Sequence, residues 1–340
     1  MPGCPDRQPG GAVAAYRPPC GKYPMWGGGM AEPLAVVPAG VGGSATGSVA
    51  QVVNRALAEF VSREVAALAA TDPELGRFGR TAAEWVLSGG KRLRPTFAHW
   101  GLRGLVGLDA PLDPVLPALA ALELFHASAL AQDDLMDGSA TRRGRPTVHR
   151  ALADQHVACG RTGGADRFGT AAAVLVGDLC LVWADRLLAT AALPARALLD
   201  ARRCYDQMRV DVIAGQDLDV VGATDAGSWS LGRALLVARL KTASYTVQRP
   251  LLFGAALVGR RPDARVTAAY DAYGRAVGER SSSATICWAR SVTRPCPASR
   301  PATTRTCCGA AASRVCCWLV RLVGLSAGGL AGRGGGGGQG

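Results

Sequence analysis

The stretch Glu123-Leu-Phe-His126-Ala-Ser-Ala-Leu-Ala-Gln-Asp133-Asp134-Leu-Met-Asp137 decides how the rest of this 340-residue sequence is interpreted. On a helix, residues four positions apart lie on one face, so we expect Asp133 and Asp137 to project together with Asp134 beside them. Carboxylates this close repel one another unless a cation lies between them. Oxygen ligands at this spacing suit Mg²⁺, which keeps several waters and shares its coordination with substrate phosphates.

An acidic cluster of this kind can also be an ordinary solvated helix face. The neighbouring residues favour the metal site, because they make the helix apolar and buried, where unpaired carboxylates are costly. Shortly downstream, Arg142 and Arg143 offer adjacent guanidinium groups that suit diphosphate oxygens. The apolar neighbours are Leu124, Phe125, Leu130, Leu135 and Met136.

Apolar residues recur at helical spacing from Val49 to Val258, with charged residues between them. No stretch keeps the alternating pattern of a strand. The sequence therefore predicts an all-α fold of long helices joined by short turns. The expected breaks are Gly89-Gly90, Gly144 to Pro146, Gly160 to Gly164, Pro194, Gly222 to Gly227 and Arg260 to Pro262.

The net charge of +12 first suggests nucleic acid as a partner, but its distribution argues against that. No Asp or Glu follows Glu279, and seven arginines from Arg290 to Arg333 supply +7 of the total. The rest of the chain carries only +5. No segment is long and apolar enough to predict a membrane span, and no signal peptide is visible, so we expect a cytoplasmic protein.

The motifs together resemble those of the trans-isoprenyl diphosphate synthases. That family carries D-D-x-x-D followed by R-R-G-x-P, and both occur in this sequence with the expected gap. Five signatures in the family's order are far more specific than any one of them, and the resemblance covers about residues 50–279. The other three are Gly89-Gly90-Lys91-Arg92-Leu93-Arg94-Pro95, Gly215-Gln216-Asp217-Leu218-Asp219 and Lys241-Thr242.

The resemblance implies a Mg²⁺-dependent prenyltransferase with two diphosphate sites in a bundle of roughly ten antiparallel helices around a central cavity. It also implies a homodimer. The residues implied for isopentenyl diphosphate are Lys91, Arg94, His126 and Arg143. For the allylic diphosphate, Asp133 and Asp137 would hold the Mg²⁺ ions that bridge to it, and Arg142 and Lys241 would contact it directly. Asp134 is implied as a further catalytic residue. Thr242 and Gln216 would line the reacting centre.

Each of these residues also has a structural interpretation. His126 can be a satisfied core histidine, and Lys241 an ordinary surface lysine. Asp217 and Asp219 can cap a helix or hold the arginines instead of contacting metal. We interpret Asp178 as a buried structural carboxylate bonded to a neighbouring helix.

Two other functions use similar motifs. A class I terpene cyclase also carries D-D-x-x-D on a helix, but it lacks the G-G-K-R-x-R-P and R-R-G-x-P elements. A non-catalytic partner subunit would bind a complete synthase. Within the synthases, the resemblance suggests a product of about twenty carbons or longer, because Ser128 and Ala129 are small at the positions that floor the elongation cavity.

The two ends of the chain differ from the middle. Residues 1–48 are rich in Gly, Pro and Ala, and we expect a disordered leader there. Residues 49–279 form the synthase-like domain. Residues 280–340 are expected to be a disordered basic tail that results from translation in the wrong reading frame. If one lost G is restored to a plausible coding sequence after the codon for Glu279, the corrected frame can encode Ala-Phe-Gln-Leu-Arg-Asp-Asp-Leu-Leu-Gly. This string resembles the family's second aspartate-rich motif, so its loss would impair the enzyme.

Overall fold

The computed structural model describes residues 48–224, 230–259 and 263–292. Within them the chain forms ten α-helices, one π-helical segment (η2) and a two-residue hairpin, which confirms the predicted all-α fold. The elements are α1 (Val49–Thr71), α2 (Pro73–Leu87), α3 (Leu93–Val106), α4 (Leu116–Met136), β1 (Thr141–Arg142), β2 (Arg145–Pro146), α5 (Val148–Ala158), α6 (Ala165–Ala189), α7 (Ala195–Thr224), α8 (Leu231–Ala238), η2 (Arg239–Gln248), α9 (Arg249–Ala256) and α10 (Ala264–Val292).

The first two helices show why the helical region begins where it does. Ser48 caps α1 in a capping box, accepting from Gln51 N at 3.4 Å while Gln51 Oε1 accepts from Ser48 N at 2.9 Å. Asp72 caps α2 by accepting from the backbone of Glu74 at 2.6 Å, and Pro73 fixes its first turn.

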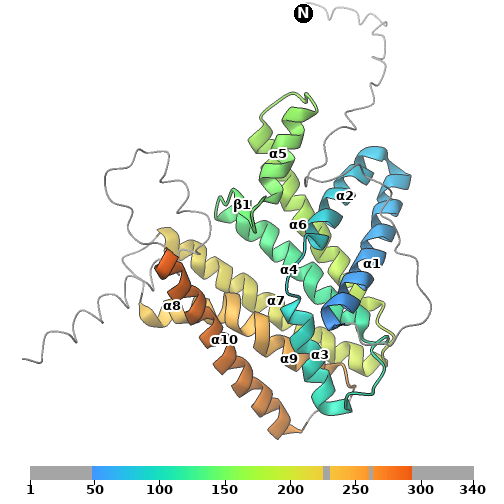
Figure 1. Cartoon of the computed structure of the whole chain (residues 1–340), viewed down its shortest axis with the longest axis vertical. Helices are drawn as coiled ribbons and strands as arrows, with labels where there is room; N and C mark the ends of the chain where they lie inside the picture. The colour runs from blue at the N-terminus through green and yellow to red at the C-terminus, as the bar shows by residue number, and fades with distance from the viewer. Residues whose placement is uncertain (1–47, 225–229, 260–262, 293–340) are drawn as a thin grey trace, which may run out of the picture.

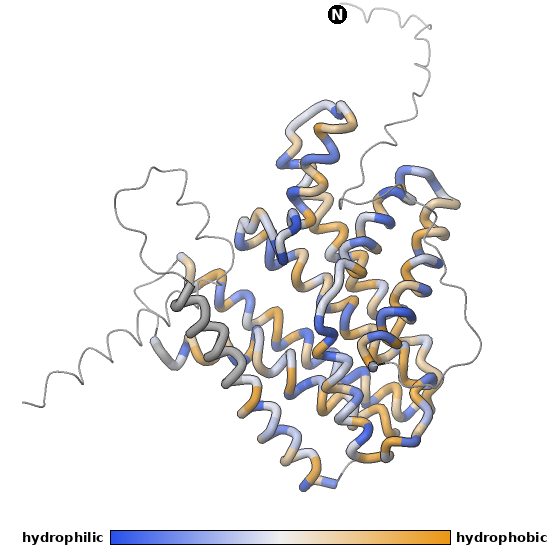
Figure 2. The backbone as a smooth tube through the Cα atoms, viewed as in Figure 1, coloured by the Kyte–Doolittle hydropathy of each residue, from blue (hydrophilic) through white to orange (hydrophobic). Residues whose placement is uncertain are grey.

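Helix α4 lies in the middle of the bundle, with α1 and α2 on one side and α7 to α10 on the other (Figure 1). It is apolar on almost every side, and it packs mainly against α6 and also against α1 and α3. Hydrophobic residues recur along all the surrounding helices (Figure 2). The fully buried large side chains include Leu119, Leu122 and Leu124 on α4, with Trp183 on α6 and Tyr205 on α7. The first turns of α4 are buried on nearly all sides, whereas its last turns, which carry the aspartates, are only partly buried, with Met136 52% exposed.

The stretch from Ser230 to Val258, which lies between two of the expected breaks, contains a change of helix type. Residues 239–248 are π-helical, with α-helix on both sides. The spacing of hydrophobic residues over ten positions is too short to distinguish a π-helix, which has about one more residue per turn, from an α-helix. This segment carries the Lys241-Thr242 motif.

The expected domain boundary at residue 279 falls inside α10, whose backbone continues as helix to Val292. The predicted leader ends where α1 begins. Residues 1–47 and 293–340 lie outside the described residues, so the two terminal segments stay predictions there.

Candidate active site

The carboxyl end of α4 brings acidic and basic side chains from three helices into contact. Lys241 Nζ on η2 lies 2.9 Å from Asp133 Oδ1 and 2.6 Å from Asp219 Oδ2 on α7. Burial works to lower the pKa of Lys241, but the charges of Asp133 and Asp219 outweigh it, so the pKa is raised. Lys241 is therefore a fixed cation between two carboxylates.

Asp134 lies in a different environment from the open acidic cluster expected from the spacing. Its side chain is 1% exposed, and Arg142 Nε donates to both of its oxygens at 2.8 Å. Because Asp134 is one position further along α4, it is rotated by about 100° from Asp133 and points inward. Burial raises the pKa of Asp134, and the Arg142 guanidinium opposes that rise. Asp134 thus holds Arg142, whose Nη2 also donates to Asp133 Oδ2 at 2.9 Å.

The β1–β2 hairpin turns Arg142 and Arg143 in opposite directions. Arg143 has a left-handed φ of 54°, which is uncommon for a residue with a side chain. Its guanidinium donates to the backbone carbonyl of Gly89, in the loop between α2 and α3. A Cβ at Gly90 would lie only 3.2 Å from Arg143 Nη1, so the second glycine of the pair leaves room for this arginine. Arg142 thus faces the acidic end of α4, and Arg143 faces the Gly89-Gly90 loop.

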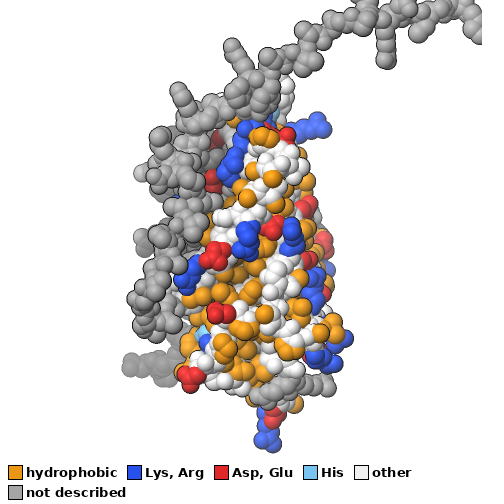
Figure 3. Space-filling view, turned by 90° about the vertical axis from the view of Figure 1, so that its right-hand side faces the viewer, with side chains coloured by type: hydrophobic (Ala, Val, Ile, Leu, Met, Phe, Trp, Pro, Cys, Tyr) orange, Lys and Arg blue, Asp and Glu red, His pale blue; other side chains and the backbone are white. Residues whose placement is uncertain are grey.

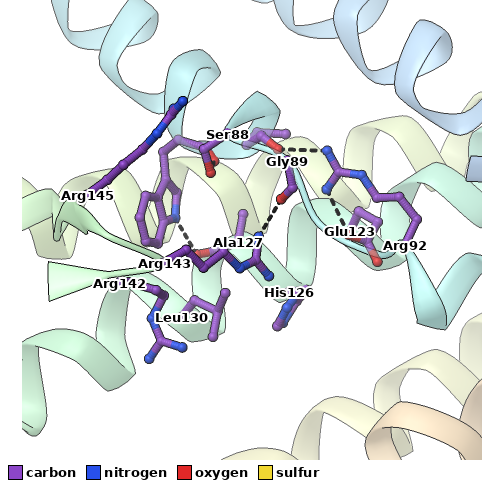
Figure 4. Close-up of a pocket in the computed structure, with 12 residues that line it drawn as sticks. Ser88, Gly89, Arg92, Glu123, His126, Ala127, Leu130, Arg142, Arg143 and Arg145 are labelled. Atoms are coloured by element: carbon purple, nitrogen blue, oxygen red, sulfur yellow. Dashed lines mark hydrogen bonds and ion pairs between the residues drawn. The ribbon is translucent and has the colours of Figure 1, made fainter. Parts of the chain in front are cut away.

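Between that loop and α4 lies a small cavity of about 60 Å³, which we call the arginine pocket (Figure 4). One buried acid, Glu123, offsets one of the arginines through an ion pair of 2.8 Å to Arg92. The remaining excess of positive charge suits an anionic ligand. The charged and polar side chains that line the pocket are Ser88, Arg92, Glu123, His126, Arg142, Arg143 and Arg145.

His126 lies in the arginine pocket as predicted, and it contacts a residue that the sequence did not single out. Its Nδ1 is 2.9 Å from the hydroxyl of Tyr245 on η2. Burial lowers the pKa of His126 well below its usual value, and Arg94, Arg143 and the other nearby arginines add to this effect. The imidazole is therefore neutral near pH 7.

The remaining predicted residues do not all reach the arginine pocket. Arg94 stacks on the Tyr245 ring, with its Cζ 3.9 Å from the ring centroid, and is not among the pocket's lining residues. Lys91 and Thr242 are exposed and line neither of the two cavities described. Gln216 lies where predicted, beside the end of α4, with its Nε2 at 3.6 Å from Met136 Sδ.

A larger cavity of about 760 Å³ extends from Asp133 between α4, α6 and α7. Ser128 and Ala129, the two small residues of the product-length prediction, both line it. On α7 the lining runs from Val220 back to Arg202, which is roughly 27 Å along the helix axis. This cavity is the counterpart of the central cavity expected from the resemblance.

Close packing of α7 against η2 brings Lys241 to Asp219. A Cβ at Gly215 would lie 2.7 Å from Lys241 N, so only glycine allows this approach. On the other side of η2, a Cβ at Gly278 would lie 2.7 Å from the carbonyl oxygen of Ala243, which brings α10 equally close.

The carboxylates at the end of α4 offer part of a site for Mg²⁺. Asp219 Oδ1 is buried and accepts no hydrogen bond from the described residues, and Asp133 Oδ1 contacts Lys241 Nζ at 2.9 Å, so both oxygens have acceptor capacity left. Within the same residues, no three His, Cys, Asp or Glu side chains converge as a complete metal site. Such a partial set fits an ion that takes its other ligands from water and phosphate.

The sequence suggested for Asp219 a helix cap or a contact with the arginines, not its contact with Lys241, and it gave no indication of Tyr245. The G-Q-x-x-D motif could have indicated Asp219 as a functional residue. A tyrosine within an apolar helix, such as Tyr245, has no sequence feature that indicates a function. Asp178 is exposed, which contradicts the expectation that it is buried. It does contact a neighbouring helix, accepting from Gln132 Nε2 at 3.4 Å.

Comparison with known proteins decides the family. A family model described as polyprenyl synthetase matches residues 77–280, which is more than half of the chain. The chain belongs to the polyprenyl synthetase family. The matched range includes all five motifs, the arginine pocket and the α4–α7–η2 cluster.

Individual polyprenyl synthetases show the same likeness. A solved geranylgeranyl pyrophosphate synthase from Corynebacterium glutamicum, complexed with isoprenyl diphosphate and magnesium, is 36% identical with a TM-score of 0.64. That match covers 68% of this chain and 65% of the solved one. A short chain isoprenyl diphosphate synthase of Methanocaldococcus jannaschii is 31% identical over 143 residues, 40% of this chain and 35% of the relative.

A farnesyl diphosphate synthase of Geobacillus stearothermophilus is 29% identical over 209 residues, 56% of this chain and 59% of the relative. The chain thus spans less than two thirds of the length of these curated polyprenyl synthetases. In the portion that the structure describes, no helix combines the length and the apolar character that a membrane span requires.

Proposed function

We propose that this polyprenyl synthetase condenses isopentenyl diphosphate with an allylic diphosphate to form a longer trans-polyprenyl diphosphate. The observation that carries the proposal is that two adjacent arginines have different partners. Arg142 donates to Asp133 in the Asp133–Lys241 cluster and also lines the arginine pocket, whereas Arg143 donates to the Gly89 carbonyl on the other edge of that pocket. Two adjoining cationic sites at the end of α4 can hold two diphosphates with their hydrocarbon ends close together.

The chemistry follows from these charges. Arg142 and Lys241 stabilise the allylic diphosphate as its C–O bond breaks, which leaves an allylic carbocation. The double bond of isopentenyl diphosphate attacks that cation and forms the new C–C bond. A proton is then lost to the released diphosphate, which restores a double bond. We expect the apolar side chains that line the larger cavity, among them Phe125, Leu181 and Val212, to limit the access of water, which would otherwise quench the cation.

Mg²⁺ would be held by Asp133 and Asp137, and when bound it would add positive charge where the leaving diphosphate gathers negative charge. The solved relative complexed with magnesium supports this part of the proposal. We expect the allylic diphosphate to bind at least tenfold more weakly after Mg²⁺ is removed with a chelator. Calorimetric titration with and without the metal measures this, and equal affinities would contradict it.

The decisive experiment combines binding with turnover. The chain as written and a frame-corrected chain are each titrated with isopentenyl diphosphate and assayed for prenyl transfer with radiolabelled substrate. We expect both to bind isopentenyl diphosphate and the corrected chain to be far more active. The reason is that the second aspartate-rich motif is absent after residue 279 in the sequence as written. Failure of the corrected chain to transfer prenyl groups would contradict the proposed function.

We propose products of about twenty carbons or longer. The small side chains of Ser128 and Ala129 leave the 760 Å³ cavity open below Asp133, so a growing chain can pass them. The corrected chain should therefore elongate beyond a fifteen-carbon intermediate, as measured by chromatography of the dephosphorylated products. A product distribution that stops at fifteen carbons would refute this.

We also propose a homodimer, supported by exposed apolar side chains on α6 and α7. Leu175 and Val182 on α6 are 57% and 55% exposed, and Val210 and Ile213 on α7 are 59% and 63% exposed. Apolar area of this kind on two neighbouring helices is typical of a subunit interface. On the face in Figure 3, by contrast, apolar side chains lie among Arg, Lys, Asp and Glu of both signs. The predicted cytoplasmic location stays a prediction.

A further inference from the structure

His126 and Tyr245 form a buried pair behind the arginine pocket. His126 lines the pocket and Tyr245 does not, although the Tyr245 hydroxyl lies 2.9 Å from His126 Nδ1. The two nitrogens of an imidazole ring point apart. Since Nδ1 faces Tyr245, Nε2 points away from that hydroxyl, and we infer that it faces the pocket that His126 lines (Figure 4).

The direction of this hydrogen bond decides what His126 offers to a ligand. The imidazole is neutral, so one ring nitrogen carries the proton and the other is a bare acceptor. If Nδ1 donated to Tyr245, Nε2 would present a lone pair to a pocket that suits anions. The phenol proton would then also need another acceptor. Within residues 48–224, 230–259 and 263–292, His126 Nδ1 is the one atom able to accept a hydrogen bond that lies at hydrogen-bond distance from that hydroxyl.

Arg94 favours the opposite direction. Its guanidinium lies over the Tyr245 ring at 3.9 Å and is held there by donating from Nη2 to Thr246 Oγ1 at 3.2 Å. A fixed cation beside the phenol attracts the lone pairs of the oxygen and turns its proton away. That proton then points at His126 Nδ1.

We propose that Tyr245 is a positioning residue, because its hydroxyl donates to His126 Nδ1 and thereby fixes the proton on Nε2. The pocket then presents an N–H donor to a diphosphate beside the guanidinium of Arg143. The inference rests on the proposed function, since it names how that site recognises isopentenyl diphosphate. It also assigns a role to Arg94, which does not line the pocket but orients the Tyr245 hydroxyl toward His126.

The tautomer is tested directly by long-range ¹H–¹⁵N correlation NMR on the full chain with ¹⁵N-labelled histidine, with the His126 signals assigned from His126→Gln. We expect the Nε2–H pattern in the wild type and a mixture of tautomers in Tyr245→Phe. An Nδ1–H pattern in the wild type, or an unchanged Nε2–H pattern in Tyr245→Phe, would overturn the inference. This measurement requires neither ligand nor activity.

Binding is tested by calorimetric titration with isopentenyl diphosphate in a double-mutant cycle. We expect Tyr245→Phe to weaken binding by roughly threefold to tenfold in the wild type and to have no further effect in His126→Gln. The matched control is Tyr205→Phe, because Tyr205 is equally buried and its hydroxyl has no hydrogen-bond partner in the described residues. It should leave the affinity unchanged.

Two outcomes separate the inference from the proposed function. If the wild type binds isopentenyl diphosphate and Tyr245→Phe weakens it equally in both backgrounds, Tyr245 does not act through His126 and the inference fails. If the wild type does not bind isopentenyl diphosphate at all, the proposed function fails, and the recognition role of Tyr245 fails with it. The NMR result still decides the tautomer in that case.

Discussion

At the scale of single residues, Asp134 determines where Arg142 points. Both Asp134 oxygens accept from Arg142 Nε, and this fixes the guanidinium so that its Nη2 reaches Asp133. A buried charge pair of this kind contributes little net stability when intact, but removing one member leaves the other without compensation.

Replacing Asp134 by Asn should therefore reduce the free energy of unfolding by about 1–3 kcal/mol, since Arg142 is left partly buried with one carboxylate fewer. Urea denaturation followed by circular dichroism measures this. The matched control is Asp154→Asn on α5, whose side chain is exposed, and which should change stability by less than about 0.5 kcal/mol. Equal effects of the two variants would show that the Arg142 pair has no structural role.

His126 should make stability depend on pH. Its pKa in the folded state lies well below 6.5, so as pH falls below 6.5 the unfolded chain binds a proton that the folded chain does not. Stability should therefore fall with decreasing pH, by up to about 1.4 kcal/mol per pH unit from this group. His126→Gln should make the decline between pH 6.5 and 5 shallower. Some pH dependence of stability would remain in this variant, because burial also lowers the pKa values of His99 and His149. An unchanged slope in His126→Gln would contradict this prediction.

At the scale of elements, the contact between α7 and η2 assembles the site. Gly215 permits the close approach that brings Lys241 to within 2.6 Å of Asp219 Oδ2. The π-helical segment places Lys241 in contact with Asp133 on α4 and Asp219 on α7, and it places Tyr245 in contact with His126 on α4. π-Helical segments inside longer helices are frequent at functional sites.

Gly215→Ala should separate α7 from η2, because its Cβ would lie 2.7 Å from Lys241 N. We expect a loss of about 1–3 kcal/mol in stability and at least tenfold weaker binding of the allylic diphosphate. The control is Gly232→Ala in α8, where a Cβ would meet only Ser230 Oγ at 3.8 Å. That change should be neutral or stabilising by up to about 1 kcal/mol. Thermal unfolding and calorimetry measure both variants, and similar results for the two glycines would refute the packing argument.

At the scale of the whole molecule, the exposed apolar side chains of α6 and α7 suggest that the folded chain associates. The 760 Å³ cavity lies between these helices and α4, so the proposed partner subunit on α6 and α7 would also cover one side of it. Since we propose that the growing product occupies this cavity, we expect association and product length to be physically coupled.

Leu175→Glu on α6 should convert a dimer to a monomer, because it places a charge in a desolvated apolar contact. Light scattering after gel filtration should give twice the chain mass of 35.0 kDa for the wild type and a single chain mass for the variant. Leu108→Glu is the control, since Leu108 is 70% exposed but lies in the loop after α3, away from α6 and α7. A monomeric wild type, or equal dissociation by both variants, would exclude an interface at α6.

The sequence by itself determined the fold class, the family and most of the charged site. Helical periodicity and the glycines that separate helices are local features, so they can be recognised from residues close in sequence. The five motifs are local in the same way, and they indicate the two diphosphate sites that we propose. For that reason Asp133, Arg142, Arg143 and His126 could be predicted from the sequence.

The tertiary structure decided which of these residues act together. The burial of Asp134, the contact of Asp219 with Lys241 and the stacking of Arg94 on Tyr245 all depend on helices far apart in the chain. The π-helical segment is also a feature that only the tertiary structure shows, because it occurs where η2 packs closely against α7 and α10. Contacts between distant segments depend on backbone approach and side-chain direction, and neither of these is encoded in local spacing.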